Sequence, residues 1–289
     1  LKRLNLTILD HKENLHMLEN SIGRYKNPKH SVTIALCGKY NGLHDAYKSI
    51  IEAFIHSGIE NDTQVRLKWV DTEKLEEAED VSDFLDDVDG FLIPGGFGDR
   101  GIEGKVMVAK YAREKGIPFF GICLGLQCAI IDFARHVCGW KDANSTEFRK
   151  GCKFPVIDLM HGQKKVKSKG ATMRLGAYPC RVKSRTRAYK AYRRTNINER
   201  HRHRFEVNNK YRKKMEDKGL IISGENLELN LVEMIEIKSH PWFVGVQFHP
   251  ELKSRIVNVH PLFRNFIAAA IDVRENHNLN VNYKKTQPV

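Results

Sequence analysis

A cysteine stands between two glycines in the stretch Gly121-Ile-Cys123-Leu-Gly125, after the apolar run Ile117–Ile122 and before a helical pattern over Leu124–Val137. This G-x-C-x-G arrangement at a strand-to-helix junction is typical of a nucleophile elbow, in which glycines permit a sharp turn. A sulfur at a helix N-terminus is favoured as the thiolate, the form that attacks an amide carbonyl. The alternative is a buried structural cysteine between small residues, but the strand before it and the helix after it favour Cys123 as a nucleophile.

A histidine and a glutamate, His249 and Glu251, stand two residues apart just after the apolar run Phe243–Phe248. A thiol that attacks an amide needs a partner that accepts and returns protons. A carboxylate beside the imidazole would orient it and stabilise its charged form, the third role in a catalytic triad. The alternative is a histidine in an ordinary turn before proline. Because triads are assembled in space, the order Cys…His…Glu is permitted, and we predict that both side chains reach Cys123.

The first half of the sequence alternates short apolar runs with helical patterns, which favours a parallel sheet covered by helices. The second half predicts loops, short antiparallel strands, a hairpin around His240-Pro241 and a closing helix at Pro261–Val273. The predicted fold class is therefore α/β, with an open, mostly parallel sheet, flanking helices and some antiparallel strands in the second half. Strands are expected at Val32–Leu36, Val65–Val70, Gly90–Ile93, Ile117–Ile122, Leu231–Ile237 and Phe243–Phe248, and helices at Asp45–Gly58, Glu103–Lys115 and Leu124–Val137.

The two ends of the chain differ from its middle. Residues 1–30 are polar with a weak helical pattern, and we expect a linker that ends near Asn27-Pro28. Residues 275–289 are rich in Asn and Lys and are expected to form a flexible tail. The main domain would then span residues 31–274. Because the first residue is Leu1 rather than Met, we expect the sequence to be a piece of a longer chain.

Composition argues against several classes of function. No run reaches the roughly 18 apolar residues that a membrane helix needs, and no leader pattern predicts secretion. The six cysteines form no C-x-x-C pair, so a zinc site or a dithiol redox motif is not expected. Scattered single thiols fit a reducing, cytoplasmic setting.

The formal net charge of +13 is concentrated in one part of the chain. Residues 164–214, the basic segment, hold 19 Lys or Arg and two Glu, so the other residues are mildly acidic in sum. Such a segment can be a solvated face, an anion site or a surface for an acidic partner. It also suggests a nucleic-acid-binding module as an alternative function. Its few aromatic residues lack the interleaving of a base-stacking platform, and we predict no nucleic-acid partner.

Together these motifs resemble the class I, triad-type glutamine amidotransferases. Pro94-Gly-Gly96-Phe-Gly98 fits the oxyanion segment of that family, in which the backbone N–H groups of Gly96 and Leu124 would stabilise a tetrahedral oxyanion; an ordinary turn is the alternative. The resemblance runs from about Val32 to about Ala270. Several further strings are similar to the CTP synthase family: Asp45-Ala-Tyr-Lys-Ser49, Gly121-Ile-Cys-Leu-Gly-Leu-Gln127, Asn144-Ser-Thr-Glu-Phe148, Thr172-Met-Arg-Leu-Gly176, Arg200-His-Arg-His-Arg-Phe-Glu206 and His240-Pro-Trp-Phe243.

The resemblance implies a glutaminase that hydrolyses L-glutamine, through a thioester on Cys123, to glutamate and ammonia. Arg204 would suit the α-carboxylate of glutamine because its guanidinium can form paired hydrogen bonds, and Glu147 would suit the α-ammonium. No metal or other cofactor is implied in this domain. By position in the motifs, the residues that bind glutamine would be Gly96, Leu124, Gly125, Leu126, Gln127, Glu147 and Arg204.

The resemblance also implies a longer enzyme, a cytoplasmic homotetramer without a membrane partner. A preceding synthetase domain would use Mg, ATP and the ammonia to convert UTP to CTP, and residues 1–30 would link it to the glutaminase domain. GTP would be an allosteric activator. The glycine-rich loop Phe97–Gly101 resembles the lid of the family, and Arg100 would help to sense GTP.

Three positions depart from the residues that are usual in the family. Leu126 replaces methionine, Ala171 replaces glycine and Leu252 replaces an aromatic residue. None of these changes touches a proposed catalytic group. The rival families are the amidotransferase parts of GMP synthetase or carbamoyl-phosphate synthase, and cysteine peptidases of similar fold. The strings at 144–148 and 200–206 favour the CTP synthase family over these rivals.

Overall fold

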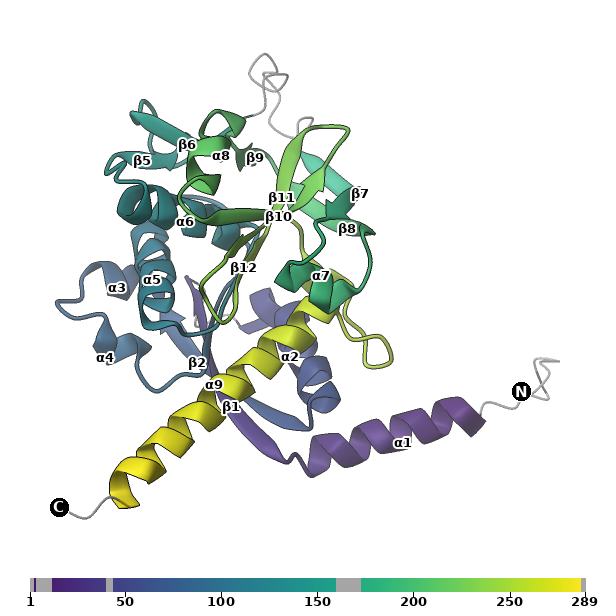
Figure 1. The fold of residues 1–289 in the computed structure, drawn as a ribbon. Coiled ribbons are helices and arrows are strands. Elements are labelled where there is room, and N and C mark those ends of the chain that lie inside the picture. The colour runs from purple at the N-terminus through teal and green to yellow at the C-terminus, as the bar shows by residue number, and fades with distance from the viewer. Residues whose placement is uncertain (1–2, 4–11, 40–43, 160–172, 287–289) are drawn as a thin grey trace.

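One long mixed sheet organises the chain (Figure 1). The computed structural model describes residues 3, 12–39, 44–159 and 173–286. The order of strands is β2-β1-β3-β4-β12-β11-β10-β7-β8, and pairing is parallel from β2 to β12 and antiparallel from β12 to β8. The strands are β1 (His30–Gly38), β2 (Thr63–Asp71), β3 (Gly90–Ile93), β4 (Phe119–Ile122), β7 (Arg174–Val182), β8 (Asn196–His203), β10 (Leu220–Asn226), β11 (Leu231–Ile237) and β12 (Phe243–Val246).

A second, small sheet joins three short strands, β5 (Ala143–Ser145), β6 (Phe154–Leu159) and β9 (Phe205–Val207), in the order β5-β6-β9. The helices are α1 (Lys12–Lys26), α2 (Lys48–Glu60), α3 (Thr72–Glu76), α4 (Ser82–Leu85), α5 (Ile102–Lys115), α6 (Leu124–Asp132), α7 (Arg187–Tyr192), α8 (Asn209–Glu216) and α9 (Pro261–Thr286), with short turns η2 (His44–Tyr47), η3 (Phe133–Val137) and η5 (Pro250–Leu252). None of the described helices is long and apolar enough to cross a membrane.

Two hydrophobic cores form because the inner strands are apolar on both faces, as expected of parallel strands covered by helices. On β1, Ala35 belongs to the core under α5 and α6, whereas Ile34 and Leu36 belong to the core under α2 and α9. Figure 1 shows α5 and α6 on one side of the sheet, with α2 and α9 on the other. Each fully buried side chain of the size of Ile34 or Leu36 contributes about 1.5–3 kcal/mol to folding.

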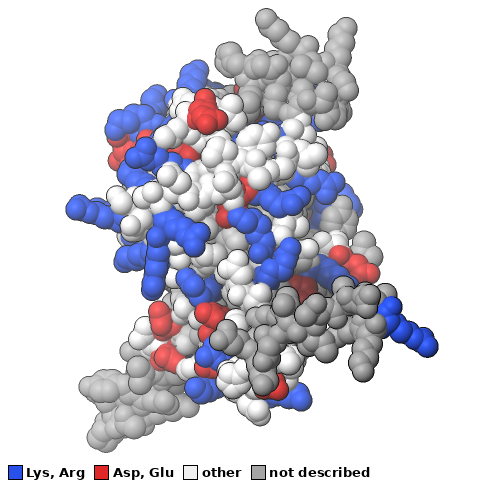
Figure 2. Space-filling model, turned by 90° about the vertical axis from the view of Figure 1, so that its right-hand side faces the viewer, with Lys and Arg blue, Asp and Glu red and all other residues white. Residues whose placement is uncertain are grey.

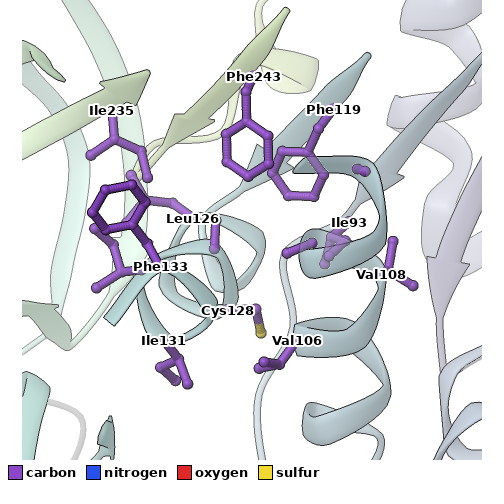
Figure 3. Close-up of a cluster of buried hydrophobic side chains, with 14 of the residues drawn as sticks. Ile93, Val106, Val108, Phe119, Leu126, Cys128, Ile131, Phe133, Ile235 and Phe243 are labelled. Atoms are coloured by element: carbon purple, nitrogen blue, oxygen red, sulfur yellow. The ribbon is translucent and has the colours of Figure 1, made fainter. Parts of the chain in front are cut away.

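The register of β4 against β12 is marked by two stacked rings. Phe119 lies directly opposite Phe243, with ring centroids 4.3 Å apart (Figure 3). Because the pairing is parallel, the same register places Ile122 opposite Val246. The residues that follow each strand therefore emerge side by side at one edge of the sheet.

The α/β fold with flanking helices is confirmed, and so is the antiparallel pairing of β11 with β12 around His240-Pro241. The predicted end of the closing helix at Val273 is wrong, because α9 continues to Thr286. Residues 262–286 contain no Gly or Pro to stop a helix. The weak helical pattern near the start corresponds to α1. The division into linker, domain and tail stays a prediction.

Candidate active site

Cys123 lies at the turn between β4 and α6, where it occupies the N-cap position of the helix with φ 52° and ψ −97°. The flanking glycines allow neighbouring backbone segments to pack closely against the turn. A Cβ on Gly121 would lie 2.6 Å from the carbonyl carbon of Gly125, and one on Gly125 would lie 2.3 Å from the backbone oxygen of Ile93. The unusual backbone conformation falls on the cysteine itself, as a nucleophile elbow requires.

The predicted triad residues come together at the end of β12. The backbone N–H of Cys123 donates to the oxygen of Val246 at 2.7 Å, which joins the elbow to that strand. His249 follows three residues later, and its Nδ1 lies 2.7 Å from Oε1 of Glu251. A Cβ built on Gly95 would lie 2.6 Å from Cε1 of His249 and 3.5 Å from Cβ of Cys123. The imidazole, the sulfur and this glycine are therefore immediate neighbours.

The charge state of His249 depends on its partners. Burial by itself lowers the pKa of His249, but the interactions of the imidazole with Cys123 and Glu251 raise it to about 10. Glu251 fixes the tautomer because it accepts the proton on Nδ1. Nε2 is buried and makes no hydrogen bond within the described part of the chain. This is the arrangement of an imidazolium held ready to pair with a thiolate and to give up a proton.

The triad opens into a pocket of about 390 Å³. A hollow of about 540 Å³ elsewhere on the chain is larger, but no cysteine lines it. The pocket therefore combines access for a small molecule with a nucleophile. Its lining residues are Ala46, Tyr47, Ser49, Ile50, Gly95, Gly96, Phe97, Cys123, Arg202, His249, Glu251 and Leu252.

Glu147 and Arg204, which we expected to bind glutamine, do not line this pocket, but they are electrostatically coupled to each other. Burial raises the pKa of Glu147, against a hydrogen bond from the backbone of Gly98 and the attraction of Arg204. Arg204 is half-buried, and its Nε has no hydrogen-bond partner among the described residues. Gly98 adjoins Phe97 of the pocket, so the pair lies beside the pocket rather than inside it.

The first turn of α6 supplies the remaining expected residues. Leu124 is the first residue of α6, a position at which the backbone N–H has no acceptor within the helix. The side chain of Leu126 is fully buried in the core (Figure 3), and Gly125 has the packing role given above. Gln127 is also buried, and its Nε2 bonds the backbone oxygen of Phe205 at 3.1 Å and Oε1 of Gln247 at 3.3 Å. A binding role for these residues stays a prediction.

Two residues without an individual predicted role contact the site. Arg202 lines the pocket, and its guanidinium carbon lies 5.7 Å from the ring centre of Phe97. Gln247 is fully buried, and its Nε2 lies 3.7 Å from Sγ of Cys123. Arg202 lies two residues before Arg204 in the string Arg200–Glu206, and this spacing could have indicated that both arginines lie near the site. An amide at the end of a buried strand carries no such signal.

The described part of the basic segment, residues 173–214, does not form one uniform patch. Figure 2 shows lysines and arginines separated by uncharged and acidic residues on the face that carries β7 and β8. Some of its basic residues form buried ion pairs; Arg174, for example, lies between Glu206 and Glu233. Lys164–Lys169, Ala171 and Thr172 lie outside the described residues. Within the described ranges, no group of three or more His, Cys, Asp or Glu is arranged to hold a metal ion.

Comparison with known proteins agrees with this geometry. Residues 43–269 match the family "Glutamine amidotransferase class-I". The chain is 54% identical over 283 residues to CTP synthase from Chlorobium phaeovibrioides, covering 92% of this chain and 48% of the relative. It is 51% identical over 277 residues to CTP synthase from Caldanaerobacter subterraneus, covering 96% of this chain and 51% of the relative. The chain thus spans about half the length of these relatives.

A solved structure, the glutaminase domain of Trypanosoma brucei CTP synthase with bound acivicin, has 38% sequence identity and a TM-score of 0.78. The match covers 83% of this chain and 93% of that domain. The fold, the elbow and the match over nearly all of that domain lead to one assignment: the chain belongs to the class I glutamine amidotransferase family, among the glutaminase domains of CTP synthases.

Proposed function

We propose that this chain hydrolyses L-glutamine to glutamate and ammonia with Cys123 as nucleophile, His249 as general acid and base, and Glu251 as the residue that orients the imidazole. One observation carries the proposal. A cysteine at a strained strand-to-helix turn lies in one pocket with an imidazole whose other nitrogen is 2.7 Å from a carboxylate.

In the first half of the reaction, the Cys123 thiolate attacks the side-chain amide carbon of glutamine. The oxyanion that forms would be stabilised by the backbone N–H groups of Gly96 and Leu124. When the C–N bond breaks, His249 gives its proton to the nitrogen, which leaves as ammonia, and a γ-glutamyl thioester remains on sulfur. In the second half, His249 takes a proton from water, the hydroxide attacks the thioester, and glutamate and the thiolate are released.

The α-ammonium and α-carboxylate of glutamine would be held by Glu147 and Arg204. Burial raises the pKa of Glu147, so a cationic ligand would favour its ionised form. The unpartnered Nε of Arg204 leaves a donor for a carboxylate. Because both residues lie beside the pocket, the substrate would extend from the sulfur past the loop at Phe97 and Gly98.

Replacement of Cys123 by Ala tests the proposal. The variant should lose glutaminase activity by at least about 10⁴-fold, since removal of a nucleophile eliminates the covalent route. Ammonia release from L-glutamine gives the rate. A glutamine-analogue electrophile, followed by mass mapping, should label Cys123 of the unmodified protein and no residue of the variant. Glutaminase turnover in Cys123→Ala that equals the wild-type rate would refute the assignment.

We further propose that the ammonia serves a longer protein. The chain covers about half of each CTP synthase relative, which supports a preceding synthetase domain that uses ATP and Mg to convert UTP to CTP, in a cytoplasmic homotetramer. GTP would activate the glutaminase through the loop Phe97–Gly101. Arg100 in this loop is exposed and lies 3.4 Å from Glu73, where a phosphate could compete for it. Addition of UTP, ATP and glutamine to the full-length protein should yield CTP.

A further inference from the structure

Gln247 lies next to the nucleophile but has no place in the triad. It follows β12 directly, two residues before His249, and its side chain is fully buried. Its Nε2 lies 3.7 Å from Sγ of Cys123, a hydrogen-bond distance for the large sulfur atom. The parallel register of β4 and β12, marked by the Phe119–Phe243 stack, sets this approach.

The neighbours of Gln247 decide which end of its amide faces the sulfur. The backbone oxygen of Phe205 can only accept, so the Gln127 atom 3.1 Å from it must be the nitrogen. That same nitrogen lies 3.3 Å from the Gln247 side chain, where it requires an acceptor. The oxygen of Gln247 therefore faces Gln127, and its NH₂ group faces Cys123. The orientation follows from the hydrogen-bond chain, which removes the usual ambiguity of a glutamine amide.

The position of Gln247 is also fixed through its backbone, whose N–H donates to the oxygen of Glu233 at 2.9 Å. The side chain is 0% exposed, so water does not compete for its amide. A hydrogen bond to a charged acceptor is worth more in such a site than at the surface. A rigid N–H donor directed at sulfur thus favours the thiolate over the thiol.

Another cysteine on the same helix shows what burial does without such a donor. Cys128 is packed in the apolar core (Figure 3), and burial raises its pKa to about 12. Cys123 is nearly as buried, with 4% of its surface exposed. A reactive thiolate at this depth therefore needs groups that offset the loss of water.

We propose that Gln247 is a catalytic residue whose side-chain N–H stabilises the Cys123 thiolate, together with His249 and the N-terminus of α6. This inference rests on the proposed glutaminase function and adds a neutral donor to the triad. The donor bonds the anionic sulfur before attack, and its bond weakens when the sulfur becomes a neutral thioester. The bond forms again when the thioester is hydrolysed and the thiolate returns.

The test measures the rate of Cys123 alkylation by iodoacetamide against pH in the full-length protein, with mass mapping of the labelled residue. Gln247→Met keeps the approximate volume and removes the N–H. We expect the midpoint of the profile to rise by about one pH unit or more, which is the effect of one hydrogen bond to a charged group. Below the midpoint, alkylation should then be at least about tenfold slower.

The matched control is Asn226→Leu, which removes another buried amide, one whose Nδ2 bonds the backbone oxygen of Pro179 at 3.0 Å. Its midpoint should equal that of the unmodified protein. If Gln247→Met does not fold, Gln247→Glu decides, because its carboxylate still accepts from Gln127 but offers no N–H to sulfur, and the midpoint should rise further. An unchanged midpoint in the folded variant overturns the proposal for Gln247. Loss of glutamine hydrolysis by the unmodified protein would instead overturn the glutaminase function.

Discussion

His249 and His201 are both largely buried and each lies near a glutamate, yet their pKa values move in opposite directions. Nδ1 of His249 lies 2.7 Å from Glu251, and the partners of His249 outweigh burial and raise its pKa to about 10. Nε2 of His201 lies 3.6 Å from Glu233, and burial, followed by the charge of Arg174, lowers its pKa to about 2. Burial acts in the same direction at both histidines, so the neighbours decide the outcome.

The neighbour that differs is an arginine. The guanidinium of Arg174 lies 2.7 Å from Glu233, the carboxylate next to His201, and 3.1 Å from Glu206. Within the described part of the chain, Glu251 pairs with His249 and with no Lys or Arg. The His249–Glu251 pair is therefore available for proton transfer, whereas Glu233, bound to Arg174, links strands β7 and β11. Of these two buried histidines, the one whose carboxylate also binds an arginine has the lowered pKa, and the one whose carboxylate does not has the raised pKa.

The largest effect is expected from breaking the catalytic pair. Glu251→Gln keeps the shape but replaces the acceptor of the Nδ1 proton, so the imidazole loses its preferred tautomer and the support for its charge. We expect the glutaminase kcat to fall by about 10²–10⁴-fold and the pKa of His249 to fall. Ammonia-release kinetics and an NMR titration of the histidine rings measure these two quantities.

The control for this variant is Glu275→Gln. Glu275 also pairs with a histidine, His30, at 3.2 Å, but both side chains are exposed. Its removal should leave kcat within about twofold, since exposed pairs contribute little. A loss of less than tenfold in Glu251→Gln would mean that the imidazole needs no carboxylate.

The structural pair is broken by Arg174→Met. This change leaves Glu206 and Glu233 as buried carboxylates without their arginine, a situation that costs about 3–5 kcal/mol of unfolding free energy. Urea unfolding measures the loss. Arg181→Met, on the same strand but exposed, should change stability by only about 0.5 kcal/mol. Equal stabilities for the two variants would show that the arginine does not hold these strands together.

The two pairs also differ in whether a sequence pattern points to them. The catalytic pair has a local signature, because His249 and Glu251 are two residues apart after an apolar strand, and Cys123 has flanking glycines. The structural cluster has no such signature. Arg174 is 32 residues from Glu206 and 59 from Glu233, and arginine and glutamate at arbitrary spacing predict a solvated surface.

The same reasoning explains the fold predictions. The parallel strands were predicted well because they are short runs of apolar residues; β3 has the predicted bounds, Gly90–Ile93. The small sheet was not assigned strand by strand, since β5 has only three residues and β6 and β9 pair at long range. Strands this short lack a period that a sequence can display. The contact of Gln247 with sulfur was missed because it depends on strand register, which sequence patterns do not specify.

The smallest expected effect is the pH dependence that the Glu233 carboxyl gives to the free energy of unfolding. Burial raises the pKa of Glu233 from 4.5 to about 7, against the attraction of Arg174. The folded protein then holds a proton that the unfolded chain releases, so this contribution to stability is complete below about pH 4.5 and is lost as the pH rises through about 7. Glu233→Gln cannot titrate and still offers an oxygen to Arg174. Its unfolding free energy should therefore fall less between pH 5 and 8, by about 2–3 kcal/mol, than that of the unmodified protein.

His201 does not disturb this measurement at its folded-state pKa of about 2, because it stays neutral in the folded protein across the whole range. Its titration in the unfolded chain is the same in both proteins, so the difference between the two pH profiles isolates the carboxyl. A Glu233→Gln profile parallel to that of the unmodified protein would mean that Arg174 keeps the carboxylate ionised at every pH tested. In that case the two pairs would differ only in which cation each glutamate binds, and not in whether the glutamate carries a proton.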